Sequence, residues 1–218
     1  PSKSEPNQTV SPPEPEQRLG SFDLREILGE GAMGVVYRAR HRTLGREVAL
    51  KKLKDQYASR PDAVRRFIDE AWAVNQVGHP NIVVITDLVT GDDGVYCIME
   101  RLTGETLADE LTREERLSPR RALTLARQAA DALGAAHLKG VVHRDVKPTN
   151  LFLCAGADDV PALKVLDFGV AQLSRDDEDA PRDEPAHGLL TPAYMSPEQA
   201  NGDAVDGRSD VYALGVVI

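Results

Sequence analysis

The chain has 218 residues, of which 41% are hydrophobic and 28% charged, a composition typical of a soluble globular protein with one full core or two small lobes. Its formal net charge of −9 argues against a general binder of nucleic acids or anionic membranes. The sequence shows no signal peptide and no apolar run long enough to span a membrane. Cys97 and Cys154 lie in or beside apolar runs without metal-binding spacing, which indicates reduced thiols in a cytoplasmic protein.

The first 20 residues are rich in Pro, Glu and Ser and nearly lack apolar side chains. Such a segment cannot bury enough apolar surface to offset the entropy lost on ordering. We therefore predict a disordered leader over residues 1–20, with order beginning near Phe22.

A glycine-rich turn then separates two apolar stretches that favour β-structure. Residues 29–34 read Gly-Glu-Gly-Ala-Met-Gly, and Val35 and Val36 continue as a strand. A dinucleotide-binding fold has a similar glycine pattern but needs a helix directly after the last glycine. The pattern therefore favours a β-hairpin.

A third strand, residues 48–50 (Val-Ala-Leu), ends at Lys51. Residues 62–74 have the period of a helix, with an apolar face that includes Phe67 and Ala71. Glu70 and Asp69 both lie near that face, so either carboxylate is a candidate partner for the lysine.

A Pro break at residues 79–81 precedes two predicted strands, 82–85 and 95–99, around a turn at 91–94. Sheet, helix and sheet in this order predict a small α+β lobe. From Ser118 the period becomes helical, with this serine as N-cap, Pro119 in the first turn and an alanine- and leucine-rich stripe to residue 136. This pattern predicts a second, mostly helical lobe.

Residues 141–150 (Val-Val-His-Arg-Asp-Val-Lys-Pro-Thr-Asn) form a short polar loop between apolar runs at 141–142 and 151–153, each of which we predict to be a buried strand. Pro148 prevents the loop from continuing as a helix. In such a loop Asp145 can accept a proton from a hydroxyl group. Lys147 can neutralise a phosphoryl group in transfer, and Asn150 can hold a metal ion.

Four further patterns follow the loop. Asp167 begins an Asp-Phe-Gly turn after a strand, and residues 174–187 are acidic and Pro-rich, which predicts an exposed mobile loop. Residues 191–199 read Thr-Pro-Ala-Tyr-Met-Ser-Pro-Glu-Gln, and residues 210–217 are mostly apolar and begin with Asp210.

Taken in order, these motifs resemble those of the protein kinases, in the form of bacterial serine/threonine kinases of the eukaryotic type. His-Arg-Asp-x-Lys-Pro-x-Asn resembles their catalytic loop, and the glycine hairpin, Val-Ala-Leu-Lys and Asp-Phe-Gly resemble their nucleotide-binding motifs. The resemblance implies an α+β, protein kinase-like two-lobe fold. It places a kinase domain at 21–218, with an N-lobe at about 21–99, a hinge at about 100–104 and a partial C-lobe at 105–218. It also implies that the chain ends inside the family's helix F. The resemblance therefore leaves open whether a membrane anchor follows residue 218.

The resemblance implies transfer of the γ-phosphoryl group of Mg²⁺-ATP to Ser or Thr of protein substrates, and of the kinase itself, in bacterial signalling. Asp145 would be the base, Lys147 and the Mg²⁺ ions held by Asn150 and Asp167 would offset charge, Lys51 would bind the triphosphate and Glu70 would hold Lys51. The resemblance gives fourteen candidate nucleotide-binding residues: Leu28, Gly29, Glu30, Gly31, Ala32, Met33, Gly34, Val36, Ala49, Lys51, Met99, Glu100, Leu102 and Asp167.

The resemblance also implies that Arg144 receives a phosphate or carboxylate from the acidic loop, and that Asp210 braces the catalytic loop. Two departures concern substrate docking, because Leu190 replaces the family's usual Gly and Thr149 replaces an acid found in some members. The later helices of the family are also missing. The alternative is therefore a catalytically incompetent fragment that binds nucleotide or docks partners, and a dinucleotide enzyme ranks third.

Overall fold

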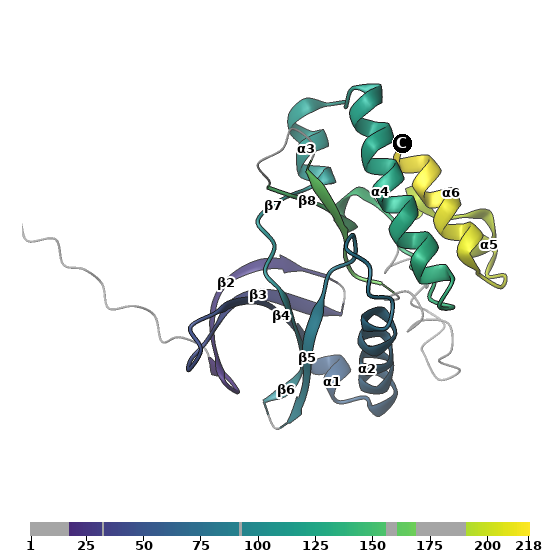
Figure 1. Ribbon diagram of the computed structural model, residues 1–218. Helices are drawn as coiled ribbons and strands as arrows, with labels where there is room; N and C mark the ends of the chain where they lie inside the picture. Colours follow the sequence, from purple (N-terminus) through teal and green to yellow (C-terminus); the bar gives the residue numbers. More distant parts are fainter. Residues whose placement is uncertain (1–17, 32, 92, 156–160, 169–190) are drawn as a thin grey trace, which may run out of the picture.

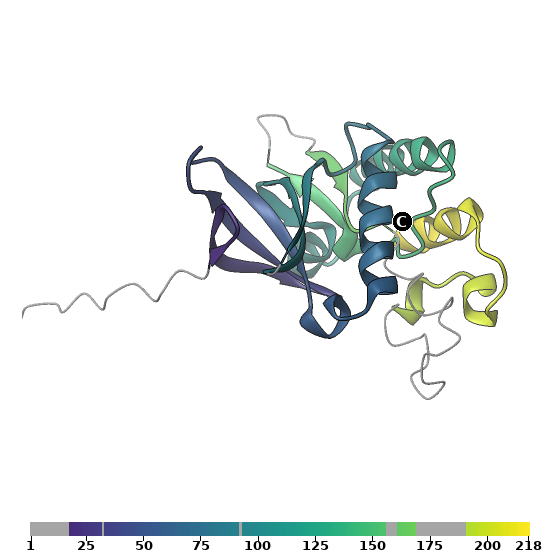
Figure 2. The same cartoon turned by 90° about the horizontal axis from the view of Figure 1, so that it is seen from below.

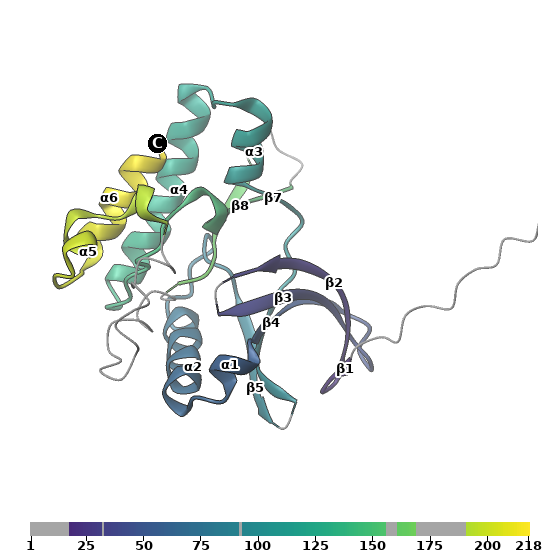
Figure 3. The same cartoon turned by 180° about the vertical axis from the view of Figure 1, so that it is seen from behind.

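The structure is a computed structural model that describes residues 18–31, 33–91, 93–155, 161–168 and 191–218. It has a curled β-sheet lobe and a mainly helical lobe (Figure 1). The two-lobe fold expected from the sequence is therefore confirmed, and Figure 3 shows the same division from behind. Ala32, residues 1–17 of the predicted leader and the acidic loop at 174–187 lie outside the described residues. Arg18 and Leu19, which we predicted to belong to the leader, instead pair as a short strand with residues 22–23.

The first lobe is built on one antiparallel sheet with the strand order β1-β2-β3-β4-β6-β5. Its strands are β1 (Arg18–Leu19), β2 (Phe22–Glu30), β3 (Gly34–His41), β4 (Glu47–Leu53), β5 (Ile85–Gly91) and β6 (Gly94–Glu100). Gly29 on β2 lies opposite Val36 on β3. The glycine-rich segment is thus a hairpin turn followed by a strand, as the sequence predicts.

Two helices complete this lobe, α1 (Asp55–Ala58) and α2 (Pro61–Asn75). The view from below in Figure 2 shows α2, in dark blue, alongside the sheet. Its buried residues are Ala63, Phe67, Ala71 and Val74, at helical spacing. Phe67 packs into a cluster with the apolar side chains of β4 and β6, so the sequence pattern placed the face correctly.

The strand predicted from residue 82 begins three residues later. Ile82 and Val83 instead join the second lobe: the Val83 N–H donates to the Val165 carbonyl at 3.1 Å, and the Val165 N–H donates to the Asn81 carbonyl at 2.8 Å. Because these backbone groups are already paired with the other lobe, the segment cannot enter the first sheet until Ile85.

The second lobe contains a small antiparallel sheet with the order β7-β8-β9 and four α-helices within the described residues. Its elements are β7 (Gly104–Thr106), α3 (Leu107–Glu114), α4 (Pro119–His137), the 3-10 helix η1 (Pro148–Asn150), β8 (Leu151–Cys154), β9 (Ala162–Val165), the 3-10 helix η4 (Pro192–Tyr194), α5 (Pro197–Asn201) and α6 (Gly207–Val217).

Helix α4 forms the centre of this lobe and contacts α6 and β9 (Figure 1). As predicted, Ser118 is its N-cap, with the hydroxyl oxygen accepting from the Arg121 N–H, and Pro119 is in the first turn. Three alanines on its buried face, Ala129, Ala132 and Ala136, are fully buried. Small side chains there let neighbouring elements approach closely, which brings α6 and the catalytic loop near to its last turn.

Two local predictions around the catalytic loop are wrong. Residues 141–142 are not a strand, because the Val141 N–H bonds back to the Ala136 carbonyl at 3.0 Å and closes a turn after α4. Pro148 does not simply end helical structure, since it begins η1, where its fixed φ is suited to a first helical position. Within the described residues no helix is long and apolar enough to cross a bilayer.

Candidate active site

Lys51 lies on β4 with its side chain on the face that packs against α2. Ala49 and Leu53, two positions away on either side, lie on the same face and belong to one apolar cluster. The Lys51 Nζ forms an ion pair with Asp167 Oδ1 at 2.7 Å. Burial lowers the pKa of Lys51, but the negative charges of Asp167 and Glu70 outweigh it and raise the pKa above its usual value. Lys51 is therefore a fixed positive charge.

Glu70 lines the same cavity as Lys51 and Asp167 but forms no ion pair with Lys51 within 4.0 Å. The predicted Lys51–Glu70 pair is thus not made here, because Asp167 takes its place. Burial raises the pKa of Glu70 to about 8, against the opposing charge of Lys51. Asp69, the competing candidate, is exposed and lies 3.8 Å from Arg65, so the geometry favours Glu70 as the residue that faces the site.

Asp167 follows β9 in a left-handed backbone conformation, with φ of +50°. This conformation costs energy for a residue with a Cβ and is held by its neighbours. The next residue, Phe168, is buried, and its ring lies 4.6 Å from the His143 ring. Burial raises the pKa of Asp167, but the charge and hydrogen bond of Lys51 prevail and lower it, so the carboxylate stays ionised.

The catalytic loop brings its three predicted side chains together. The Lys147 Nζ lies 2.8 Å from Asp145 Oδ2. The Asn150 Nδ2 donates to the Asp145 carbonyl at 2.8 Å and to Asp145 Oδ2 at 3.1 Å. One carboxylate is thus oriented by a cation and an amide, as a base that receives a hydroxyl proton requires.

Asp210, in the first turn of α6, forms hydrogen bonds with the backbone of the catalytic loop. Its Oδ2 accepts from the His143 N–H at 2.8 Å, and its Oδ1 accepts from the Arg144 N–H at 2.7 Å. His137 Nε2, from the last turn of α4, lies 2.7 Å from the same Oδ2. Asp210 is fully buried, so these partners replace the hydrogen bonds to water that its carboxylate would make in the unfolded chain. His137 is absent from the predicted site, since a histidine ending a helix carries no signal of its own.

The His143 side chain links the catalytic loop to the segment before Asp167. Its Nε2 lies 2.8 Å from the Leu166 carbonyl, which can only accept, so Nε2 carries the proton. Its Nδ1 then accepts from the Asp145 N–H at 3.2 Å. The ring is fully buried in this neutral form. Its two hydrogen bonds fix the catalytic loop relative to the segment that carries Asp167.

The glycines of the hairpin have different structural roles. A Cβ on Gly34 would lie 2.8 Å from the Lys52 carbonyl oxygen, so the close approach of β3 and β4 excludes any side chain there. Among the described residues, a Cβ on Gly29 would have no neighbour within 4 Å, and one on Gly31 would meet its nearest atom at 3.8 Å. The chain's own packing therefore explains Gly34 alone, and the space beside Gly29 and Gly31 is available to a ligand.

The other predicted nucleotide-binding residues of the hairpin differ in exposure. Leu28 is exposed and Val36 is half-buried, so both can contact a ligand over the sheet. Glu30 is exposed and pairs with Lys54 at 2.8 Å. The Met33 side chain is buried in the apolar cluster beneath the hairpin, so its side chain cannot touch a nucleotide.

The connection between the lobes begins at the end of β6. Met99 is buried, whereas Glu100 points across to the second lobe, where its Oε1 accepts from the Lys164 Nζ at 2.6 Å and from the Val84 N–H at 2.8 Å. Leu102 lies outside any helix or strand, and its backbone groups make no hydrogen bond to other described residues. These backbone groups are free to form hydrogen bonds with the edge of a nucleotide base.

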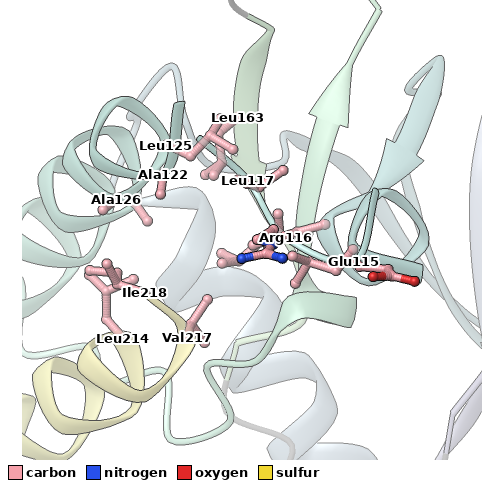
Figure 4. A pocket seen from close by; sticks show the side chains of 14 residues that line it. Glu115, Arg116, Leu117, Ala122, Leu125, Ala126, Leu163, Leu214, Val217 and Ile218 are labelled. Carbon is pink, nitrogen blue, oxygen red and sulfur yellow. The ribbon is translucent and has the colours of Figure 1, made fainter. Parts of the chain in front are cut away.

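Two cavities can be compared with this site. One lies behind Lys51, where Glu70, Asp167 and Phe168 meet apolar side chains of α2 and β6. The other lies between α3, α4 and α6 (Figure 4), and its lining is apolar apart from Glu115 and Arg116. Only the first adjoins the charged groups described above.

The donor set beside Asp145 fits Mg²⁺. Because the Asn150 Nδ2 donates to Asp145, its Oδ1 faces away and accepts no hydrogen bond from a described residue. Asp167 Oδ1 pairs with Lys51, and its second oxygen accepts no bond from the described chain. One carboxylate and one amide oxygen, completed by phosphates and water, are a usual magnesium set. No group of three His, Cys, Asp or Glu within the described residues offers a different metal site.

Thr191, at the start of the 191–199 motif, is exposed. The acids proposed as partners of Arg144, at 174–187, lie outside the described residues.

Comparisons with known proteins identify the family of this chain. The protein kinase domain family matches residues 22–218. The chain is 44% identical over 202 residues to the serine/threonine-protein kinase Pkn1 of Myxococcus xanthus, covering 92% of this chain and 28% of that protein. It is 39% identical over 201 residues to PknB of Mycobacterium tuberculosis, covering 90% and 31%.

Among solved structures, the chain resembles the crystal structure of the Mycobacterium tuberculosis PknI kinase domain, with a TM-score of 0.69 and 28% identity over 91% of this chain and 73% of that one. The chain spans only about a third of the length of the curated relatives named above. The match over residues 22–218, which is nearly all of the chain, together with the two-lobe fold, shows that this chain belongs to the protein kinase family.

Proposed function

We propose that this chain carries the catalytic machinery of a serine/threonine protein kinase, which transfers the γ-phosphoryl group of ATP to hydroxyl groups of proteins. One observation carries the proposal: Asp145, Lys147 and Asn150 converge on one point, beside a buried lysine–aspartate pair. Phosphoryl transfer needs mainly positioning and charge stabilisation, and this arrangement supplies both.

We propose one role for each residue, and the geometry supports it. Asp145 receives the proton of the substrate hydroxyl, since its Oδ2 is already oriented by Lys147 and Asn150. Lys147 then lies where it can offset charge on the group in transfer. Lys51 is the fixed cation for the α- and β-phosphates, and Glu70 is its proposed carboxylate partner once Asp167 engages the metal.

Asn150 and Asp167 are the proposed magnesium ligands, and Mg²⁺ would neutralise charge on the β- and γ-phosphates. The base of ATP would lie over Ala49 and Val36, with the backbone of Glu100 and Leu102 at its edge. We place the protein in the cytoplasm, where ATP is available and the free thiols Cys97 and Cys154 stay reduced.

The test is a phosphotransfer assay with Mg²⁺-ATP and a mixture of Ser- and Thr-containing proteins, with phosphoamino-acid analysis of the products. Asp145→Asn keeps the shape of the side chain but removes the base, and we expect the rate to fall by roughly 10²-fold or more. Nucleotide binding, measured in parallel, should be retained. If ATP binds but wild-type chain transfers nothing, the alternative of a nucleotide-binding module without transfer is correct.

A further inference from the structure

The peptide between Arg144 and Asp145 is held in an unusual way. Arg144 has a φ of +68°, a left-handed conformation that is unfavourable for a residue with a side chain. Such a conformation persists only when surrounding contacts enforce it. Because this peptide is attached directly to the Cα of Asp145, whatever enforces it also aims the Asp145 carboxylate.

Three side chains hold this part of the backbone. Asp210 accepts from the Arg144 N–H at 2.7 Å, and His143 Nδ1 accepts from the Asp145 N–H at 3.2 Å. The Arg144 carbonyl accepts from Gln199 Nε2 at 2.7 Å. The first two contacts come from groups already assigned to the catalytic loop. The third comes from α5, a helix that follows the 191–196 segment and has had no role so far.

The orientation of the Gln199 amide is fixed by its partners. Its Oε1 accepts from the Ser196 N–H at 3.1 Å, as the last member of a capping box in which Ser196 Oγ accepts from the Gln199 N–H at 3.3 Å. A flipped amide would set an NH₂ group against the N–H and an oxygen against the carbonyl. Gln199 is buried, so each mismatch would be costly.

A capping box is satisfied equally well by Glu or Gln, since only the oxygen is used. The Nε2 donor is therefore not explained by the capping of α5. It has a partner in the Arg144 carbonyl, which is 55 residues away in the chain. The serine of the box is itself anchored to α6, because Ser196 Oγ lies 3.0 Å from Ser209 Oγ.

We propose that Gln199 is a positioning residue for phosphotransfer, whose amide donor holds the Arg144 carbonyl and so aims Asp145. The proposal rests on the function proposed above. It makes α5 part of the support of the catalytic loop, together with Asp210 of α6. Because α5 directly follows the 191–196 segment, the position of that segment and the aim of the base are mechanically linked.

The test is Q199E, measured as initial rates over a range of ATP concentration and pH, beside wild type. The substitution keeps the oxygen that caps α5 and removes the donor. We expect a folded protein whose unfolding temperature is lower, because a carboxylate oxygen then faces the Arg144 carbonyl, together with a kcat lower by roughly tenfold and a KM for ATP within about twofold of wild type. A protonated carboxylic acid can donate to the carbonyl, so the deficit of Q199E should shrink as the pH is lowered from 8 to 6.

The matched control is Q56E, on the exposed surface of α1, which makes the same change of charge far from the loop. It should keep the wild-type kcat and pH profile. Glu198 adjoins Gln199 in the chain, and Asp210 and His143 bond to the same stretch of backbone, so the wild-type profile serves as the reference for every group other than residue 199. A Q199E deficit that is independent of pH, or a kcat within twofold of wild type at every pH, would overturn the proposal.

Failure of Q199E to fold would overturn the positioning role as well. The oxygen that caps α5 is retained in this variant, so such a failure would show that the amide donor is needed for folding and not for aiming Asp145. If wild type binds ATP but transfers no phosphate, the proposed function fails and the positioning role fails with it. If wild type transfers phosphate and Q199E equals it, the positioning role alone fails.

Discussion

At the scale of single residues, buried charge determines how the site behaves. Lys51, Glu70 and Asp167 share one cavity, with two carboxylates for one cation. The lysine pairs with Asp167, and the remaining carboxyl of Glu70 has its pKa raised to about 8 by burial. Near neutral pH Glu70 therefore holds a proton, which removes an uncompensated negative charge from the interior.

This gives a prediction for stability against pH. The pKa of Glu70 rises from 4.5 in the unfolded chain to about 8 in the folded protein, so the folded state binds its proton more tightly. The stabilisation from this proton is complete below pH 4.5 and is lost as the pH rises to about 8, with a slope of at most about 1.4 kcal/mol per pH unit. Denaturant unfolding at several pH values should show this slope in wild type. Glu70→Gln should remove it, and a variant that keeps the wild-type slope would contradict the assignment.

The Lys51 cation can be tested against its neighbour on the same strand. Lys51→Met removes the charge that holds Asp167 and, by our proposal, the triphosphate, so we expect phosphotransfer to fall by roughly 10²-fold or more. Lys52→Met is the matched control, because Lys52 lies on the opposite face and pairs with Asp55 at 3.3 Å on the surface. The measurement is kcat/KM for ATP in both variants. Equal losses in the two would show that strand β4 matters and the Lys51 charge does not.

Two glycine variants can separate an effect on the stability of the fold from an effect on ligand binding. Gly34→Ala should destabilise the protein by about 1–3 kcal/mol, since its Cβ would overlap the Lys52 carbonyl. Gly29→Ala should leave stability unchanged, because no atom of the described residues lies within 4 Å of the added Cβ, and it should weaken ATP binding by reducing access to the backbone. Thermal unfolding and nucleotide titration of both variants check this. Equal unfolding temperatures would refute the packing argument.

The sequence predicted which residues form the site more accurately than it predicted the contacts between them. Asp145, Lys147 and Asn150 lie within six residues, so one loop brings them together whatever the rest of the chain does. The partner of Lys51 was predicted to be Glu70, but that choice depends on how α2 is placed against β4, which no local pattern specifies. Gln199 entered the sequence analysis only as the last residue of the 191–199 motif, because its contact with the Arg144 carbonyl spans 55 residues and no local pattern encodes it.

At the scale of elements, the strongest predictions were those with both a period and a cap. Helix α4 begins after Ser118 as expected, because the cap, the following Pro119 and the apolar stripe agree. The strand expected at residues 141–142 failed because its apolar pair fits a strand or a turn equally well. The backbone of Val141 closes the turn after α4, a tertiary choice that two valines cannot encode.

The cap of α4 gives a prediction at this scale. Ser118→Ala removes the hydroxyl that accepts from the Arg121 N–H, and we expect a loss of about 1 kcal/mol in stability. Thr124→Ala lies inside the same helix, where the hydroxyl only bonds back to the Arg120 carbonyl. Alanine is the better helix former there, so this control should be neutral or slightly stabilising. The denaturant midpoint should therefore fall for Ser118→Ala and stay unchanged or rise slightly for Thr124→Ala.

At the scale of the whole molecule, the two lobes are joined by more than the connecting chain. Lys164 on β9 donates to Glu100 Oε1 at 2.6 Å and to the Ile82 carbonyl at 3.1 Å. The same Glu100 oxygen accepts from the Val84 N–H at 2.8 Å. One ion pair thus ties the end of β6, the segment before β5 and the small sheet of the second lobe. Both side chains are largely shielded, at 14% and 31% exposure, so the pair is little screened by water.

A double-mutant cycle measures what this link contributes. Lys164→Met and Glu100→Gln, alone and together, should give a coupling free energy of about 1–3 kcal/mol in unfolding experiments, because each single change leaves a shielded partner without its counter-charge. The matched cycle uses Arg65 and Asp69 on α2, an ion pair of 3.8 Å that is 84% and 71% exposed, for which we expect less than about 0.5 kcal/mol. A strong link should also make the two lobes unfold in a single transition, and Lys164→Met should broaden or split it. Equal coupling in both cycles would mean that the lobes are held together by their apolar contacts and the connecting chain, with no measurable part played by Lys164.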